Sequence, residues 1–164
     1  MPKYKRAKNR ALWHALALGL TIYIADYVSK QWILDLLARQ AYPIKLSDFF
    51  NLVLVYNEGV SFGMFQGLGR HQASIMIALT SLISLVLVIW LMRERQENYK
   101  THLWLGAAIG GAVGNITDRF LYGAVVDFLD FHLMGYHWPA FNIADMAISL
   151  SMIGLAISLF YQKK

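Results

Sequence analysis

The stretch ASIMIALTSLISLVLVIWLM, residues 73–92, contains twenty consecutive uncharged residues. At 1.5 Å per residue, a helix of that length crosses the roughly 30 Å hydrocarbon layer of a bilayer. Of the 164 residues, 57% are hydrophobic and 15% are charged, whereas a soluble domain carries about 25% charged residues. One small core cannot bury so many apolar side chains, and we therefore expect lipid to cover much of the chain.

Three further segments complete a predicted bundle. They are an apolar run over residues 11–32, a shorter glycine-rich run over 103–121 and a last apolar run over 142–161. The polar stretch ADYVSKQW takes the place of a prompt cleavage site after the first run, which favours a retained span over a cleaved signal peptide. The third run could be a buried helix of a soluble protein, but its neighbours favour a span. The sequence predicts a single all-α membrane domain over 1–164 with four transmembrane helices.

The segment between the first two spans has a different pattern. Its middle, FFNLVLVYNEGVSFGMF (49–65), is rich in aromatic and β-branched residues and is interrupted by two glycines. This composition is typical of short strands and a turn. A segment of this size is too small to fold alone. We therefore predict a small β-rich insert over about 41–70 that lies against the membrane surface.

The charges are distributed asymmetrically. The first ten residues, the loop at 93–100 and the last two residues hold ten of the 15 basic residues but only two acids. Because Lys-rich and Arg-rich loops stay in the cytoplasm, we expect both termini to be cytoplasmic and the β-rich insert to be outside. In a soluble protein, a net charge of +5 would suggest binding to nucleic acid. Here the basic residues flank membrane spans, so contact with anionic lipid explains them better. The absence of cysteine excludes disulfides and thiolate chemistry.

Several polar residues cluster at the predicted outer ends of the spans. Asp26 and Lys30 are four residues apart on the first span, and mutual neutralisation is the default interpretation. Asn115, Asp118 and Arg119 share a helical face at the end of the third span, and a helix-end ion pair between Asp118 and Arg119 is favoured over catalysis.

Two carboxylates lack so obvious a cation. Asp127 follows the third span and Asp145 opens the fourth, and a short loop between antiparallel spans would bring them together. Two close carboxyl groups share one proton, which supplies a general acid and a general base. Asn142, three residues before Asp145, could orient a carboxyl group or the substrate. Asp145 could equally be an ordinary helix cap, and Asp130 competes for the role of Asp127.

Other classes of function remain open at this point. Membrane carboxylates also mark ion paths, so a small transporter or a non-catalytic scaffold are alternatives. A metal site at His132 and His137 lacks HExxH or tight His–His spacing, and interfacial anchoring suits these residues better. A serine hydrolase that uses Ser29 or Ser61 lacks a GxSxG context.

Four stretches, in order, resemble the bacterial lipoprotein signal peptidases, also called type II signal peptidases. They are DYVSK (26–30), YNEGVSFGMF (56–65), GAVGNITDRFLYGAVVDFLDF (111–131) and WPAFNIADMAIS (138–149). Together they span nearly the whole chain. Glu58 and Val60 are a mild departure, because smaller or less charged residues are usual there in the family.

The resemblance implies an integral membrane aspartic endopeptidase of the bacterial cytoplasmic (inner) membrane. Such enzymes cut the signal peptide from diacylglyceryl-modified prolipoproteins on the N-terminal side of the lipidated cysteine. It implies a four-helix bundle with an outer β-sheet cradle, catalytic roles for Asp127 and Asp145, no metal and no cofactor. We expect a monomer whose partners are the prolipoprotein and membrane lipids, with no nucleic acid. The supporting residues implied are Asn57, Asn115, Arg119, Asn142, Asp26 and Lys30.

Overall fold

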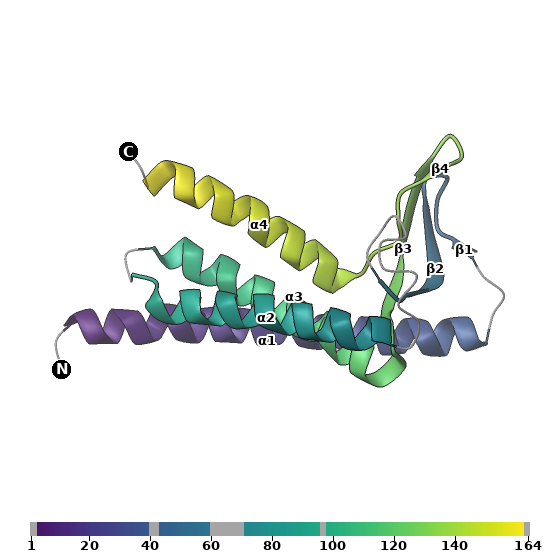
Figure 1. The fold of residues 1–164 in the computed structure, drawn as a ribbon. Coiled ribbons are helices and arrows are strands. Elements are labelled where there is room, and N and C mark those ends of the chain that lie inside the picture. Colours follow the sequence, from purple (N-terminus) through teal and green to yellow (C-terminus); the bar gives the residue numbers. More distant parts are fainter. Residues whose placement is uncertain (1–2, 40–42, 60–70, 96–97, 163–164) are drawn as a thin grey trace.

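The fold is a bundle of four helices with a small sheet at one end (Figure 1). The structure is a computed structural model that describes residues 3–39, 43–59, 71–95 and 98–162. In chain order the elements are α1 (Lys3–Ala38), β1 (Ile44–Lys45), β2 (Phe50–Asn57), α2 (Gln72–Arg93), α3 (Tyr99–Tyr122), β3 (Val125–Leu133), β4 (Tyr136–His137) and α4 (Ile143–Gln162). Both termini lie at the end of the bundle opposite the sheet.

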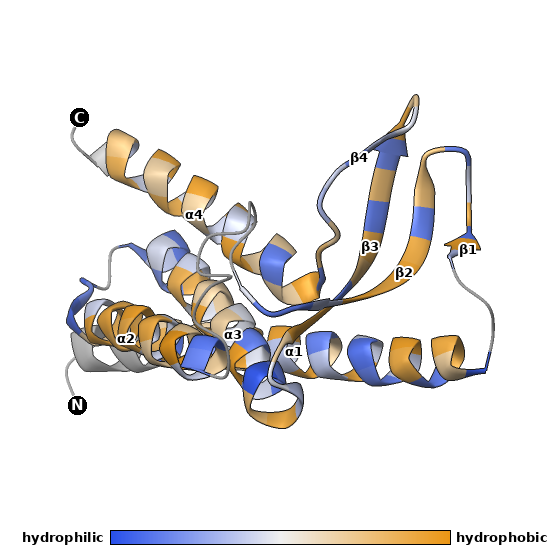
Figure 2. Cartoon of the chain, turned by 45° about the vertical axis from the view of Figure 1, so that its right-hand side comes forward, coloured by the Kyte–Doolittle hydropathy of each residue, from blue (hydrophilic) through white to orange (hydrophobic). Residues whose placement is uncertain are grey.

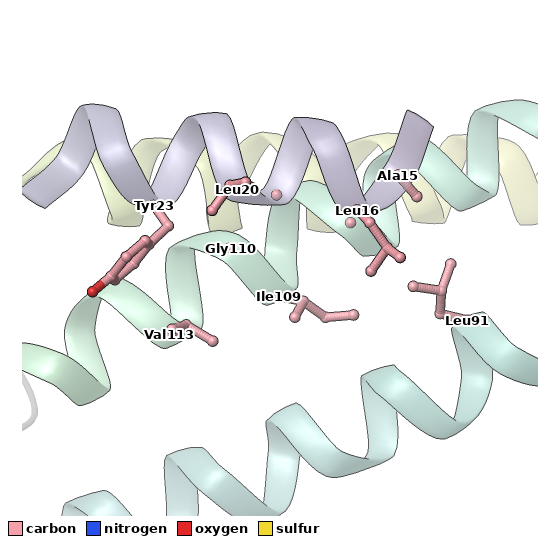
Figure 3. Close-up of a pocket in the computed structure, with 10 residues that line it drawn as sticks. Ala15, Leu16, Leu20, Tyr23, Leu91, Ile109, Gly110 and Val113 are labelled. Atoms are coloured by element: carbon pink, nitrogen blue, oxygen red, sulfur yellow. The ribbon is translucent and has the colours of Figure 1, made fainter. Parts of the chain in front are cut away.

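Helix α3 is the centre of the bundle and packs against the other three helices. Its glycines allow α1 to come close: a Cβ added to Gly106 would meet the backbone of Ala15, and one added to Gly110 would meet that of Gly19. Figure 3 shows this approach of α1 to α3, together with the apolar groove that remains between them and α2. Small residues at a helix interface are how membrane helices gain van der Waals contact.

Three of the described helices are long and apolar enough to cross a membrane, namely Arg10–Ala38, Gln72–Arg93 and Ile143–Tyr161. Apolar residues cover nearly the whole of α2, whereas α3 carries polar turns near its sheet end (Figure 2). The buried residues of α3 include His102, Asn115, Asp118 and Arg119, which lower its hydropathy. The expected third span at 103–121 is therefore a well-formed helix that its neighbours bury, and its crossing of the bilayer remains a prediction.

The sheet is larger than the sequence pattern predicts. Its four antiparallel strands have the order β1-β2-β3-β4, and only β1 and β2 come from the expected insert at 41–70. The connection between α3 and α4, expected to be a short loop, contributes the nine-residue strand β3 and then β4. In the register of β2 and β3, Val55 lies opposite Asp127 and Asn51 opposite Asp130. The expectation of a short loop was wrong because the apolar residues of β3 pair with β2, a contact that local sequence does not reveal.

The sheet is fixed to the bundle by an apolar cluster on the far end of α1. Ile33 and Leu37 of α1 pack with Leu52 of β2 and Phe128 of β3, and all four side chains are buried. This contact sets where β3, and with it Asp127, lies relative to the helices.

Candidate active site

The polar centre of the molecule lies where β3 passes the start of α4. Asn142 binds both predicted catalytic carboxylates: its Nδ2 donates to Asp127 Oδ1 at 2.7 Å, and its backbone N–H donates to Asp145 Oδ2 at 3.3 Å. The structure thus brings Asp127 and Asp145 to either side of one residue. The antiparallel bridge of Phe141 to Leu129 of β3, and not a short loop, brings the start of α4 alongside Asp127.

The first turn of α4 holds Asp145 in a reciprocal cap. Asn142 stands directly before the helix, and its Oδ1 accepts the backbone N–H of Asp145 at 2.9 Å. Asp145 in turn reaches back to the N–H of Asn142, which is the capping-box arrangement. The alternative that Asp145 is itself the N-cap is therefore incorrect: Asn142 is the cap, and Asp145 lies in the first turn, where the helix dipole favours a negative charge.

Asp127 and Asp145 have different environments. Asp127 is 1% exposed, and its Oδ2 accepts a hydrogen bond from Asn57 at 2.9 Å. Burial raises the pKa of Asp127 to about 7; the hydrogen bonds from Asn57 and Asn142 oppose this rise, and the charge of Asp145 adds to it. Asp145 is only half-buried, and its Oδ1 accepts the amide of Asn115 at 2.8 Å. Asp127 can therefore stay protonated near neutral pH beside Asp145, whose side chain is partly exposed.

A buried cation lies behind this pair. The Nζ of Lys30 is 2.7 Å from Asp26 Oδ2 and 2.7 Å from Asp118 Oδ2, and it donates to Asn115 Oδ1 at 3.1 Å. Lys30, Asp26 and Asp118 are almost fully buried. Charges in such a low-dielectric interior must be paired and hydrogen-bonded, as these three are. The expected ion pair of Asp26 with Lys30 is present, and Lys30 also contacts Asp118.

The two carboxylates of this network also fix the backbone of the site. Asp26 Oδ1 accepts the N–H of Ala144, next to Asp145, at 2.9 Å. Asp118 Oδ2 accepts the N–H of Val126, next to Asp127, at 3.0 Å. Each candidate catalytic residue thus has a neighbouring peptide group anchored to the Lys30 network.

Asp118 and Arg119 do not form the expected helix-end ion pair, because the cation that contacts Asp118 is Lys30. Arg119 is buried, and its Nη1 donates to the backbone carbonyl of Asn115 at 3.2 Å. Its Nε has no hydrogen-bond partner within the described part of the chain. The guanidinium lies in the field of Asp145 and Asp127, so it could donate to a substrate oxygen.

Asp130, the competitor for the role of Asp127, belongs to a separate cluster. It contacts His137 Nδ1 at 2.9 Å and the amide of Asn51 at 2.9 Å. Burial acts to raise the pKa of Asp130, but the hydrogen bonds from His137 and Asn51 outweigh burial and leave the pKa below its usual value. The carboxylate of Asp130 therefore already has two hydrogen-bond partners on the sheet, Asn51 on β2 and His137 on β4.

The remaining alternatives gain no support from the geometry. Within the described residues, no group of three or more His, Cys, Asp or Glu side chains could hold a metal ion, and the His132 and His137 rings stack at 4.8 Å. Ser29 donates to the backbone carbonyl of Asp26. Ser61 and Val60 lie outside the described residues.

The role of Asp118 as a partner of Lys30 had no local sequence signal, because the two residues lie on different helices.

With this geometry established, the chain can be compared with known proteins. A family model described as signal peptidase (SPase) II matches residues 18–161. The chain belongs to the signal peptidase II family. The resemblance of the four separated stretches is thereby confirmed.

Curated relatives in the signal peptidase II family cover nearly the whole chain. The lipoprotein signal peptidase of Francisella tularensis subsp. novicida is 40% identical over 149 residues, which are 90% of this chain and 92% of that protein. That of Ralstonia nicotianae is 40% identical over 87% of this chain and 81% of its own length. The lipoprotein signal peptidase of Xylella fastidiosa is 35% identical over 95% of this chain and 92% of its own length.

Two solved structures share the fold. Both are described as bacterial membrane enzymes solved by the in meso method, at 2.3 and 1.9 Å resolution. The first is 27% identical with a TM-score of 0.78, and the match covers 92% of this chain and 89% of that one. The second is 28% identical with a TM-score of 0.73, and the match covers 88% and 91%. As a member of the signal peptidase II family, the chain is an integral inner-membrane peptidase.

Proposed function

We propose that this peptidase is an aspartic endopeptidase that cleaves the signal peptide from diacylglyceryl-modified prolipoproteins, on the N-terminal side of the lipidated cysteine. The observation that carries the aspartic mechanism is the bridging of Asp127 and Asp145 by the single residue Asn142. The names of the relatives, lipoprotein signal peptidases, support the class of substrate.

In the proposed reaction, the two carboxyl groups have different tasks. Asp145, half-exposed and charged, takes a proton from a water molecule as the water oxygen attacks the scissile carbonyl carbon. Asp127, whose pKa burial raises to about 7, gives its proton to the carbonyl oxygen. Asp145 then passes the proton it took to the leaving amine nitrogen as the C–N bond breaks, and the carboxylic acid product returns a proton to Asp127. The water is activated by a carboxylate, so we propose no metal and no cofactor.

The substrate-binding roles follow from the same contacts. Asn57 and Asn142 hold Asp127, Asn115 holds Asp145, and the buried Nε of Arg119 has no hydrogen-bond partner among the described residues. We assign these residues to positioning of the dyad and of the substrate carbonyl. Asp26 positions the backbone next to Asp145, and Lys30 holds Asp26 together with Asp118, which positions the backbone next to Asp127.

The proposed orientation places the site at the outer face. Both termini lie at one end of the bundle, and ten of the 15 basic residues occur near that end in the sequence. By the positive-inside rule this end is cytoplasmic, which leaves the sheet and the two aspartates outside. There a membrane-anchored peptide can arrive laterally and meet water. We propose that α3 is the fourth span, and that the protein acts as a monomer, without nucleic acid, among membrane lipids.

The test is cleavage of a purified lipidated prolipoprotein by Asp127→Asn and Asp145→Asn variants. We expect each variant to lose at least about a hundredfold in rate, since each removes an acid–base group, while it still inserts in the membrane. The matched control is Asp130→Asn, three residues further along β3, which should keep most of its activity. An unlipidated substrate should not be cleaved by any form. Retained cleavage by either dyad variant would overturn the aspartic mechanism.

A further inference from the structure

A groove opens directly beside Asp145. It has a volume of about 360 Å³ and is lined by Trp138, Phe141, Asp145, Met146, Ser149 and Leu150. Apart from Ser149, Asp145 is its one polar lining residue, and it lies at one end of the α4 part of the lining. This volume and this mostly apolar lining are in the range of ligand sites.

The groove runs along α4 away from the polar centre. Asp145, Met146, Ser149 and Leu150 occupy positions i, i+1, i+4 and i+5 of the helix, so the groove descends about 6–7.5 Å from the carboxyl group. Met146 is 45% and Leu150 58% exposed, which leaves the groove open at the side that the bilayer would cover. It therefore connects a candidate catalytic carboxyl group with the apolar surface of a candidate membrane span.

We propose that this groove binds one acyl chain of the diacylglyceryl group on the substrate. The inference rests on the proposed function, because it names where the lipid of that substrate lies. An acyl chain fits the apolar lining, and its far end can leave the groove sideways into the bilayer. The cysteine that carries the lipid adjoins the bond to be cut, so a chain that lies in this groove holds that bond next to Asp145.

The transmembrane helix of a signal peptide does not fit the same space. With its side chains a helix is about 10–12 Å across, much wider than a single extended hydrocarbon chain. The apolar groove between α1, α2 and α3 (Figure 3) is separate, since it shares no lining residue with the groove on α4 and includes neither aspartate. Of these two grooves among the described residues, the one on α4 offers an acyl chain a path that begins at a candidate catalytic group.

The test fills the groove and varies the acyl chain. We expect Ser149→Trp to lower kcat/KM about tenfold on a substrate with palmitoyl chains, the worth of about two displaced methylene groups, and less than about twofold on one with butyryl chains. Met152→Trp is the matched control, because Met152 is a 66% exposed residue of α4 that does not line the groove. It should leave both substrates unaffected. Equal losses of Ser149→Trp on long and short chains would overturn the acyl site.

A second measurement uses the unaltered protein. A substrate whose acyl chain carries a photoreactive diazirine should crosslink to the peptide that contains Met146 and Leu150. Crosslinks confined to Leu16 and Ile109, in the groove of Figure 3, would contradict the proposal. If the wild-type protein cleaves neither substrate, the proposed function itself fails. If it cleaves both and the chain-length effect is absent, only the acyl site fails.

Discussion

Asn57 controls how readily Asp127 keeps its proton. Its Nδ2 donates to Asp127 Oδ2 at 2.9 Å, which stabilises the charged carboxylate and lowers the pKa of Asp127 against the effect of burial. In the proposed mechanism Asp127 acts as the acid, so activity should fall as the pH rises through about 7 and Asp127 loses its proton.

Asn57→Ala should move that alkaline limb to higher pH. Loss of the hydrogen bond removes a contact that favours the charged form, so the pKa of Asp127 rises, by about one pH unit. The measurement is the position of the limb in a profile of kcat against pH. Asn51→Ala, on the same strand, removes a similar bond of 2.9 Å to Asp130 and should leave the limb in place. A limb that stays still in Asn57→Ala, or moves down, contradicts the acid role of Asp127.

Single residues were partly predictable from the sequence. The proximity of Asp127 and Asp145 was expected from their places after the third and before the fourth predicted span, although a strand and not a short loop follows α3. The four-residue spacing of Asp26 and Lys30 predicted their contact. Helical spacing predicted the wrong cation for Asp118: the expected partner was Arg119 on the same helix, and the observed one is Lys30 on α1. It also could not say whether Asn142 or Asp145 caps α4, because both residue types are good caps.

At the scale of elements, Lys30 joins α1, α3, β3 and α4. Asp26 and Asp118, its two carboxylate partners, accept backbone N–H groups at the start of α4 and β3. Lys30→Met should leave both carboxylates buried without a cation and destabilise the protein by about 3–5 kcal/mol. Thermal unfolding in detergent measures this loss.

The control for Lys30→Met is Lys45→Met on β1. Lys45 also contacts a carboxylate, Asp48, at 2.8 Å, but this ion pair is exposed to solvent. We expect no measurable change in the unfolding midpoint, because water screens such pairs. Similar midpoints for the two variants would show that the buried network does not hold the elements together.

Strand β3 shows why elements were only partly predictable. Its sequence VVDFLDFHL has the short apolar run of a buried strand, but it follows a span and precedes another, where a loop is the usual connection. The pairing partner, β2, lies in a different outer segment, so the sheet depends on a long-range contact. The helices were easier to predict, because each is indicated by its own length and composition.

At the scale of the whole molecule, the opposite placement of the sheet and the termini can be tested directly. The chain contains no cysteine, so a single introduced cysteine reports its own side of the membrane. Met134→Cys, at a turn where Met134 is 95% exposed, should react with a membrane-impermeant maleimide added outside intact cells. Arg95→Cys, between α2 and α3, should react only after the membrane is opened. The reverse pattern would refute the proposed orientation.

The length of α1 has a consequence for how the protein meets membranes of different thickness. Its 36 residues form a rod of about 54 Å, well beyond the 30 Å of hydrocarbon, and Ile33 and Leu37 near its far end carry the sheet. A helix does not stretch, so a thicker or thinner bilayer can change its tilt but not its length. We therefore expect a change in bilayer thickness to alter the tilt of α1, and with it the position of the sheet relative to the membrane surface.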